Sequence, residues 1–266
     1  MPFAEVNGTT LHYRLDGPAQ GPVLMLVNSL ASALEMWDPQ IETLSAAGYR
    51  LLRYDARGHG RSAVPVGPYS IEQLTDDALG LLDALGIGRL SLCGCSLGGM
   101  IAQEFGARHG GRLDALVLFA TTAHMPAKDV WSERIASVRE RGMSAVAEST
   151  LERWFTAAGH ERLRDPIERI RRGILETPVE GYCSSAVGIR DMDLRETIRA
   201  IAVPTLVLVG EQDPGTPVSA SEFLHQRIRG SVLQVLPDAA HLANIERPEA
   251  FNEALLAFLG SRAPVG

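Results

Sequence analysis

Cysteine and lysine are scarce in this sequence. Its 266 residues include only three cysteines, Cys93, Cys95 and Cys183, and a single lysine, Lys128. An odd number of cysteines without paired spacing argues against a disulfide framework. The first residues, Met1–Ala4, lack the charged and apolar segments of a signal peptide, and no apolar run is long enough to cross a membrane. We therefore expect a soluble, cytoplasmic protein with no membrane partner.

An excess of positive charge is also missing. The chain has 25 basic and 32 acidic residues, which gives a formal net charge of −7. Binding to nucleic acid requires a basic face, so we expect no nucleic-acid partner. The charge is unevenly distributed: residues 124–200 carry 13 basic and 13 acidic side chains, so the net negative charge belongs to the rest of the chain.

Signatures of cofactor binding are absent as well. The histidine, cysteine and acidic residues do not have metal-ligand spacing, and the sequence contains no phosphate-binding loop. The glycine-containing segment Gly86–Ser91 precedes a predicted strand, whereas a dinucleotide-binding fingerprint follows one. We therefore expect chemistry that needs neither a metal nor a cofactor.

Short apolar runs alternate with helical patterns along most of the chain. Asn7-Gly8 separates two strand-like segments and is typical of a hairpin turn. Alternation of apolar strands with helices predicts a mainly parallel sheet that is covered by helices on both faces. The predicted strands of this sheet are residues 23–27, 51–55, 90–93, 115–120, 205–209 and 232–236.

Residues 124–200 interrupt this alternation. They contain no clear strand but several amphipathic helical segments, including Trp131–Arg141 and Ser144–Phe155. We interpret this stretch as a helical cap inserted between two strands of the sheet. The predicted organisation is a core of residues 1–123 and 201–266, with a cap of residues 124–200.

A Gly-x-Ser-x-Gly motif follows the third predicted parallel strand. It is Gly94-Cys95-Ser96-Leu97-Gly98, and a helical pattern begins at Gly99. This strand–turn–helix context is the one in which a nucleophilic serine is held on a strained turn, with glycines where a Cβ atom would clash. An ordinary Gly/Ser turn is the alternative. Ser96 is therefore the candidate nucleophile.

A serine hydroxyl needs a base, and the base needs an acid that orients it. In this type of fold the acid and then the histidine follow the serine in the chain. His241 follows the last predicted strand, and Asp213 lies in the loop after the preceding one, with Glu211 as the competing acid. Asp55 also ends a strand, but it precedes Ser96, and we expect it to pair with Arg57.

A negatively charged reaction intermediate requires preorganised N–H donors. The residue after the nucleophile, Leu97, supplies one backbone N–H in this type of fold. The loop Asn28-Ser29-Leu30, which follows the first parallel strand, is expected to supply the other. We favour the N–H of Leu30 as that donor; the alternative is that this loop is a plain turn.

Several motifs of the chain resemble those of the 3-oxoadipate enol-lactonases. The loop Asn28–Leu30 and the segment Arg153–Phe155 are more particular to that family than the other motifs, although the chain has Ala31 where members often have glycine. The similar segments are residues 28–30, 36–40, 53–60, 67–74, 153–156, 180–182 and 244–247.

This resemblance covers nearly the whole chain and implies the α/β-hydrolase fold. It also implies hydrolysis of the enol-lactone of the β-ketoadipate pathway of aromatic catabolism, with Ser96, Asp213 and His241 as the catalytic triad. The expected partner is a small-molecule lactone or ester. A carboxylesterase for small apolar esters, or a hydrolase of another lactone, is an alternative, and a ligand receptor that retains the triad is a third.

The enol-lactone of this pathway carries a carboxylate, which an acidic protein cannot attract from a distance. A local cation must then hold the substrate, and arginine binds carboxylates through its planar fork. Arg134 lies three residues from Trp131 on one predicted helix, and Arg153 lies beside Trp154 on the next. We hypothesise that Arg134 or Arg153 binds the carboxylate while Trp154 walls the pocket; the alternative is that both arginines are solvated surface residues.

Overall fold

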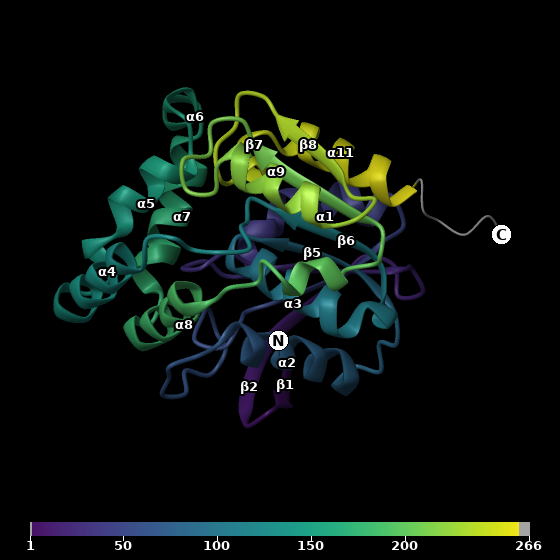
Figure 1. Cartoon of the computed structure of the whole chain (residues 1–266), viewed down its shortest axis with the longest axis horizontal. Coiled ribbons are helices and arrows are strands. Elements are labelled where there is room, and N and C mark those ends of the chain that lie inside the picture. Colours follow the sequence, from purple (N-terminus) through teal and green to yellow (C-terminus); the bar gives the residue numbers. More distant parts are fainter. Residues whose placement is uncertain (1, 261–266) are drawn as a thin grey trace.

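The computed structural model describes residues 2–260, and within them eight strands form one sheet (Figure 1). The strand order is β1-β2-β4-β3-β5-β6-β7-β8. β1 and β2 are antiparallel to each other, β2 is antiparallel to β4, and all other neighbours are parallel. The strands are β1 (Phe3–Val6), β2 (Thr9–Asp16), β3 (Val23–Val27), β4 (Arg50–Tyr54), β5 (Leu90–Cys95), β6 (Leu113–Phe119), β7 (Thr205–Gly210) and β8 (Val232–Leu236).

Helices cover both faces of the parallel part of the sheet. Parallel strands are joined by right-handed crossovers. The chain passes from β3 to β4 on one side and from β4 back across β3 to β5 on the other, so α1 and α2 lie on opposite faces. α1 packs against α11, and α2 packs against α3. These helices are α1 (Asp38–Ala46), α2 (Ile71–Ala84), α3 (Leu97–His109), α9 (Val218–Arg227), α10 (Ala243–Glu246) and α11 (Pro248–Gly260).

The core is apolar and has an aromatic cluster beside α11. Trp37, Phe119 and Phe251 are fully buried, and the ring centroids of Phe119 and Phe251 are 4.9 Å apart. The central strands are buried along almost their whole length, as expected for a sheet that is covered on both faces. The predicted fold class is therefore confirmed.

Five helices lie between β6 and β7 in the sequence. They gather at the left of the molecule in Figure 1, beyond the sheet, and α4 packs against α8. They are α4 (Lys128–Arg141), α5 (Ala147–Trp154), α6 (Ala157–Arg162), α7 (Arg164–Glu176) and α8 (Val179–Asp191). A single bridge between His124 and Asp193 is the one β-type pairing in this insertion. The division of the chain into separate core and cap domains stays a prediction.

The expected pairing of Asp55 with Arg57 is wrong. The Asp55 carboxylate accepts hydrogen bonds from Nδ1 of His12 at 2.7 Å and from the N–H of Leu34 at 2.8 Å, while Arg57 pairs with Asp77 at 2.7 Å. The two residues are close in the sequence, but the chain turns after β4, so their side chains lie beside different neighbours. Asp55 instead fixes the segment that follows β3.

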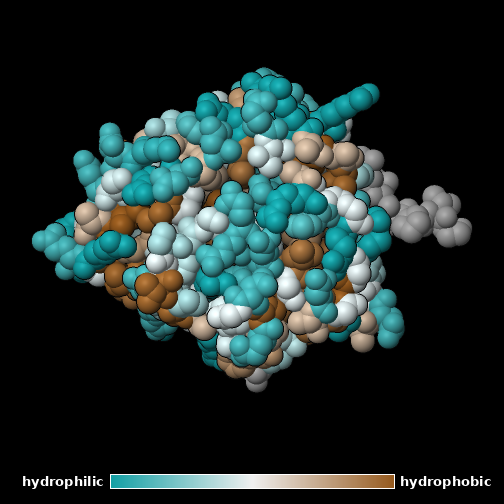
Figure 2. All heavy atoms as spheres, turned by 60° about the horizontal axis from the view of Figure 1, so that its bottom comes forward, coloured by the Kyte–Doolittle hydropathy of each residue, from teal (hydrophilic) through white to brown (hydrophobic). Residues whose placement is uncertain are grey.

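The surface is mainly hydrophilic on the face shown in Figure 2, with one group of apolar side chains at the left end and smaller groups elsewhere on this face. Exposed apolar residues of the inserted helices include Val130 at 61% and Leu175 at 45% of full exposure. None of the helices between residues 2 and 260 combines the length and the apolar character needed to cross a membrane.

Candidate active site

The carboxyl ends of β3, β5, β6, β7 and β8 meet at one edge of the sheet. The register sets this edge: Val27 lies opposite Gly94, Phe119 opposite Leu208, and Gly210 opposite Leu236. The loops that leave the edge carry the candidate residues, and ligands of open α/β sheets bind at such edges. The inserted helices stand above the same edge.

Ser96 sits on a sharp turn between β5 and α3. Its backbone has φ 55° and ψ −112°, a conformation that costs on the order of 1–3 kcal/mol and persists only when neighbours enforce it. Its N–H donates to the carbonyl of Phe119 at 3.0 Å, and its carbonyl accepts from the hydroxyl of Thr121 at 2.8 Å. A Cβ atom on Gly94 would lie 2.1 Å from the carbonyl oxygen of Gly98, so the turn requires glycine.

Two backbone segments could supply N–H donors beside Ser96. Leu97 is the first residue of α3, where helical N–H groups have no partner within the helix. The N–H of Gly98 donates to the carbonyl of Asn28 at 3.0 Å, which ties the loop after β3 to the start of α3. Leu30 belongs to this loop and lines the same cavity as Ser96. The next residue, Ala31, has φ 60°, a conformation that glycine adopts more readily.

Asp213 and His241 form a buried pair. Nδ1 of His241 lies 2.7 Å from Oδ2 of Asp213, and the two residues are 5% and 4% exposed. Burial raises the pKa of Asp213, but the charge of His241 and the hydrogen bonds from His241 and Thr216 outweigh it, so the pKa lies below its ordinary value. Glu211 is exposed, so Asp213 is the acid that contacts the histidine.

The loops that carry the pair are fastened to each other. The N–H of Gln212 donates to the carbonyl of Ala239 at 2.9 Å, and a Cβ atom on Gly210 would lie 2.2 Å from the carbonyl oxygen of Ala240. Glycine at position 210 therefore permits the close approach of the histidine loop. This packing holds Asp213 in reach of His241.

Thr216 is a site residue that the sequence analysis did not find. Its N–H and its hydroxyl donate to the two oxygens of Asp213 at 3.0 and 2.7 Å, and the N–H of Gly215 donates at 2.8 Å. An aspartate whose side chain bonds the backbone two or three residues later is an Asx-type turn, and Asp213-Pro214-Gly215-Thr216 has the residue types for one. That pattern could have identified Thr216.

A cavity of about 80 Å³ lies between the sheet edge and the inserted helices. Ser96 and His241 line it from loops at the sheet edge, and Trp154 lines it from the inserted helices. Its remaining wall is largely apolar, with Met100, Met125 and Ile189 among the lining residues. The structure thus gathers Ser96, His241, Leu30 and the three expected substrate contacts Arg134, Arg153 and Trp154 around one small space.

Arg134 and Arg153 both line this cavity and are half-buried. Arg134 donates to the hydroxyls of Tyr182 and, at 2.7 Å, Thr150, and its guanidinium lies 5.5 Å from the ring centroid of Trp131. Burial, and then the charge of Arg134, lower the pKa of Arg153. Among residues 2–260, neither arginine forms an ion pair with a carboxylate. Two neighbouring arginine side chains therefore give the cavity positive charge, which suits an anionic ligand.

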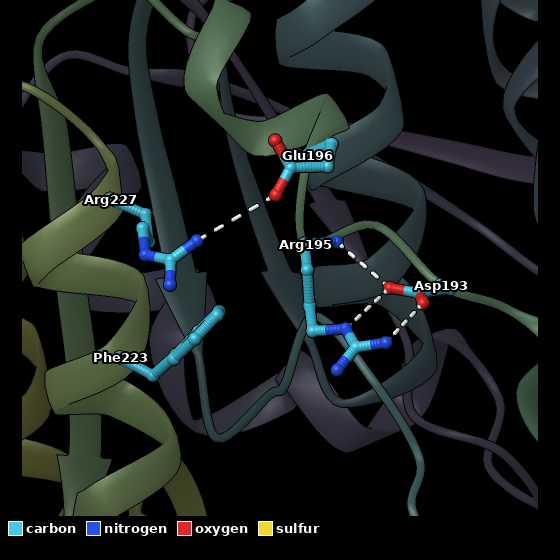
Figure 3. A pocket seen from close by; sticks show the side chains of 5 residues that line it. All are labelled: Asp193, Arg195, Glu196, Phe223 and Arg227. Atoms are coloured by element: carbon cyan, nitrogen blue, oxygen red, sulfur yellow. Dashed lines mark hydrogen bonds and ion pairs between the residues drawn. The ribbon is translucent and has the colours of Figure 1, made fainter.

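Two further hollows among residues 2–260 do not contain Ser96 or His241. The cleft in Figure 3, of about 380 Å³, is lined by charges that pair with one another: Arg195 with Asp193 at 2.6 Å, and Arg227 with Glu196 at 3.9 Å. A groove of about 970 Å³ runs between α7 and the segment after β3 and contains neither Ser96 nor His241. In the described part of the chain, no three histidine, cysteine or acidic residues gather as a group that could hold a metal ion.

Comparisons with known proteins agree with this architecture. A family model described as the alpha/beta hydrolase fold matches residues 22–248. 3-Oxoadipate enol-lactonase 2 of Acinetobacter baylyi is 36% identical over 249 residues, which is 94% of this chain and 92% of that protein.

Two solved structures are also similar. The crystal structure of the enol-lactonase from Burkholderia xenovorans has 43% identity and a TM-score of 0.95, and the match covers 97% of this chain and all of that one (100%). A thermophilic esterase from Thermogutta terrifontis has 31% identity and a TM-score of 0.92, over 98% of this chain and 99% of that one.

Proposed function

Because this chain belongs to the 3-oxoadipate enol-lactonase family of α/β-hydrolases, and is thus a hydrolase of carboxylic ester bonds, we propose that its substrate is a small lactone carrying a carboxylate. The compound we assign is 3-oxoadipate enol-lactone, which belongs to the β-ketoadipate pathway of aromatic catabolism. The reaction would proceed through an acyl-enzyme on Ser96.

One observation carries this proposal. A single small cavity is lined by Ser96, by His241 with Asp213 bonded to its far side at 2.7 Å, and by two arginines without carboxylate partners among residues 2–260. Serine, histidine and aspartate in this arrangement match the parts of a nucleophilic triad. The arginines match a substrate that brings its own negative charge.

In the first half of the reaction, His241 takes the proton of the Ser96 hydroxyl, and the serine oxygen attacks the lactone carbonyl carbon. Asp213 keeps the imidazole oriented and stabilises its protonated form. The N–H groups of Leu30 and Leu97 would bind the oxygen that becomes negative. The ring C–O bond then breaks, His241 returns the proton to the leaving enol oxygen, and a ring-opened acyl-enzyme remains.

In the second half, His241 takes a proton from water, and the resulting hydroxide attacks the acyl carbon of the ester on Ser96. The Ser96 oxygen leaves with the proton from His241, and the free acid is released. The triad is restored without any oxidant, reductant or metal in the balance.

Substrate orientation would depend on the inserted helices. A hydrogen bond from Arg134 or Arg153 to the substrate carboxylate would contribute about 1.5–3 kcal/mol to the binding free energy, the scale of a hydrogen bond to a charged group. Trp154 would close the pocket over His241. The rest of the wall is apolar and the space is small, which suits a compact ring better than a long acyl chain.

A carboxylesterase for small apolar esters is the second candidate. The apolar side chains of Met100, Met125 and Ile189 favour it, because they offer a neutral acyl group a matching surface. The esterase from Thermogutta terrifontis at 31% identity shows that this arrangement of the chain accommodates an esterase.

A substrate panel separates the two candidates. We expect kcat/KM for 3-oxoadipate enol-lactone to exceed kcat/KM for the uncharged methyl ester of that lactone and for 4-nitrophenyl acetate. Preference for the neutral compounds would favour the carboxylesterase. Absence of turnover with every lactone and ester would contradict both.

A further inference from the structure

Glu246, at the end of α10, has a buried carboxylate that joins two distant segments. It is 2% exposed. Its Oε1 accepts from the N–H and the hydroxyl of Thr156 at 3.1 and 2.5 Å, and its Oε2 accepts from the N–H of Ala240 at 2.9 Å. A Cβ atom on Gly159 would lie 2.1 Å from Oε1, so glycine there allows α6 to approach the carboxylate.

These three donors are neutral groups. A buried carboxylate is costly unless hydrogen bonds replace its lost hydration. Backbone N–H groups that have lost their acceptor in a buried place are costly as well. Glu246 therefore holds the chain at Thr156 and the chain at Ala240 in one fixed arrangement. Separation of either segment from Glu246 would leave buried polar groups without hydrogen-bond partners.

One segment adjoins the candidate base His241, and the other adjoins Trp154, which contacts it. Ala240 precedes His241, and Trp154 lies two residues before Thr156. The N–H of Leu242 donates to the carbonyl of Trp154 at 3.1 Å, and the rings of Trp154 and His241 stack with centroids 6.1 Å apart. Hydrogen bonds on either side of His241 thus tie its loop to the junction between α5 and α6.

We propose that Glu246 is a positioning residue that makes the α5–α6 junction and the His241 loop one rigid unit. The Trp154 wall and the imidazole then keep their relative position. The carboxylate touches no reacting atom and acts through His241 and Trp154. This inference rests on the proposed role of His241 as the base.

Glu246→Gln tests the proposal, because an amide has the same size but one of its two ends cannot accept a hydrogen bond. We expect kcat to fall about 10- to 100-fold, the scale of a displaced catalytic group, with KM changed by less than about 3-fold. Glu104→Gln alters a largely buried acid on α3 that bonds to neither segment, and serves as the matched control. Unchanged kcat in a folded Glu246→Gln protein would overturn the proposal.

Thr156 provides a second route if Glu246→Gln does not fold. Thr156→Ser keeps the hydroxyl, and we expect kcat close to that of the unmodified protein. Thr156→Val loses the hydroxyl donor to Glu246, and we expect a reduced kcat with nearly unchanged KM. Equal kcat in the serine and valine variants would overturn the proposal.

A spectroscopic readout does not depend on catalysis. The chain has three tryptophans, and a Trp131→Phe background leaves buried Trp37 as a constant signal beside Trp154. In a Ser96→Ala protein we expect Glu246→Gln to increase quenching of Trp154 fluorescence by acrylamide. Unchanged quenching would contradict the coupling. Failure of the proposed function would appear separately, as absence of turnover in the unmodified enzyme.

Discussion

Trp154 stacks on His241: the ring centroids lie 6.1 Å apart and the ring planes are inclined by only 19°. The tryptophan comes from the inserted helices and the histidine from the loop after β8, so the contact joins the two parts of the chain at the candidate base. Trp154 is 6% exposed and shields one face of the imidazole from water. The inserted helices are thereby part of the candidate site.

Asp213→Asn is expected to reduce kcat by about 10⁴-fold, as the equivalent change does in serine proteases. An amide cannot stabilise the protonated imidazole, and it favours the wrong tautomer. Glu211→Gln is the matched control, since Glu211 lies in the same loop and is exposed. Steady-state kinetics of the two variants decide the assignment, and a larger loss for Glu211→Gln would move the acid to that residue.

The lowered pKa of Asp213 predicts how stability depends on pH. A carboxyl group whose folded pKa is below its unfolded value of about 3.9 binds fewer protons in the folded state near that pH. Its stabilisation is complete above that value and is lost as the pH falls through the folded pKa. We expect the difference in free energy of unfolding between the unmodified protein and Asp213→Asn to shrink below about pH 4. Denaturant titrations from pH 3 to 6 measure it; a difference that grows toward acid pH would refute the sign.

Removal of the arginine that we propose as the carboxylate contact is expected to change selectivity more than general activity. Arg134→Ala or Arg153→Ala should lower kcat/KM for the charged lactone. The loss should correspond to about 1.5–3 kcal/mol of transition-state stabilisation, since a hydrogen bond to a charged group is lost. Neutral esters should be nearly unaffected. The ratio of kcat/KM for 3-oxoadipate enol-lactone to that for 4-nitrophenyl acetate measures the effect.

Arg172→Ala is a suitable control for this comparison, because Arg172 is an exposed arginine of α7 outside the small cavity. It should leave the ratio unchanged. If both cavity variants also keep the original ratio, neither arginine binds the carboxylate, and the carboxylesterase alternative gains support.

Local patterns were sufficient to predict most of the fold. The apolar runs gave the strands because parallel strands buried on both faces need continuous apolar sequence. The strand–turn–helix context of Gly94–Gly98 and the order of Ser96, Asp213 and His241 then indicated the candidate site, because parallel strands bring their carboxyl ends to one edge.

Contacts between distant segments could not be predicted in the same way. Asp55 bonds to His12 and Leu34 instead of Arg57, since three-dimensional packing, not sequence distance, chooses its partners. Glu246 reaches Thr156 only after the inserted helices fold back over the sheet. Such pairings leave no periodic signal in a single sequence, so only the folded chain shows them.

Covalent labelling at Ser96 tests the central claim most directly. The protein is mixed with 4-nitrophenyl acetate, quenched in acid within the first turnover, digested, and analysed by peptide mass spectrometry. The account predicts a burst of one nitrophenol per enzyme and one acetyl group on the peptide that contains Ser96. It also predicts that Ser96→Ala stays folded, forms no adduct and loses about 10⁴-fold or more in turnover. An acetyl group on a different residue, or a Ser96→Ala protein with undiminished turnover, would contradict it.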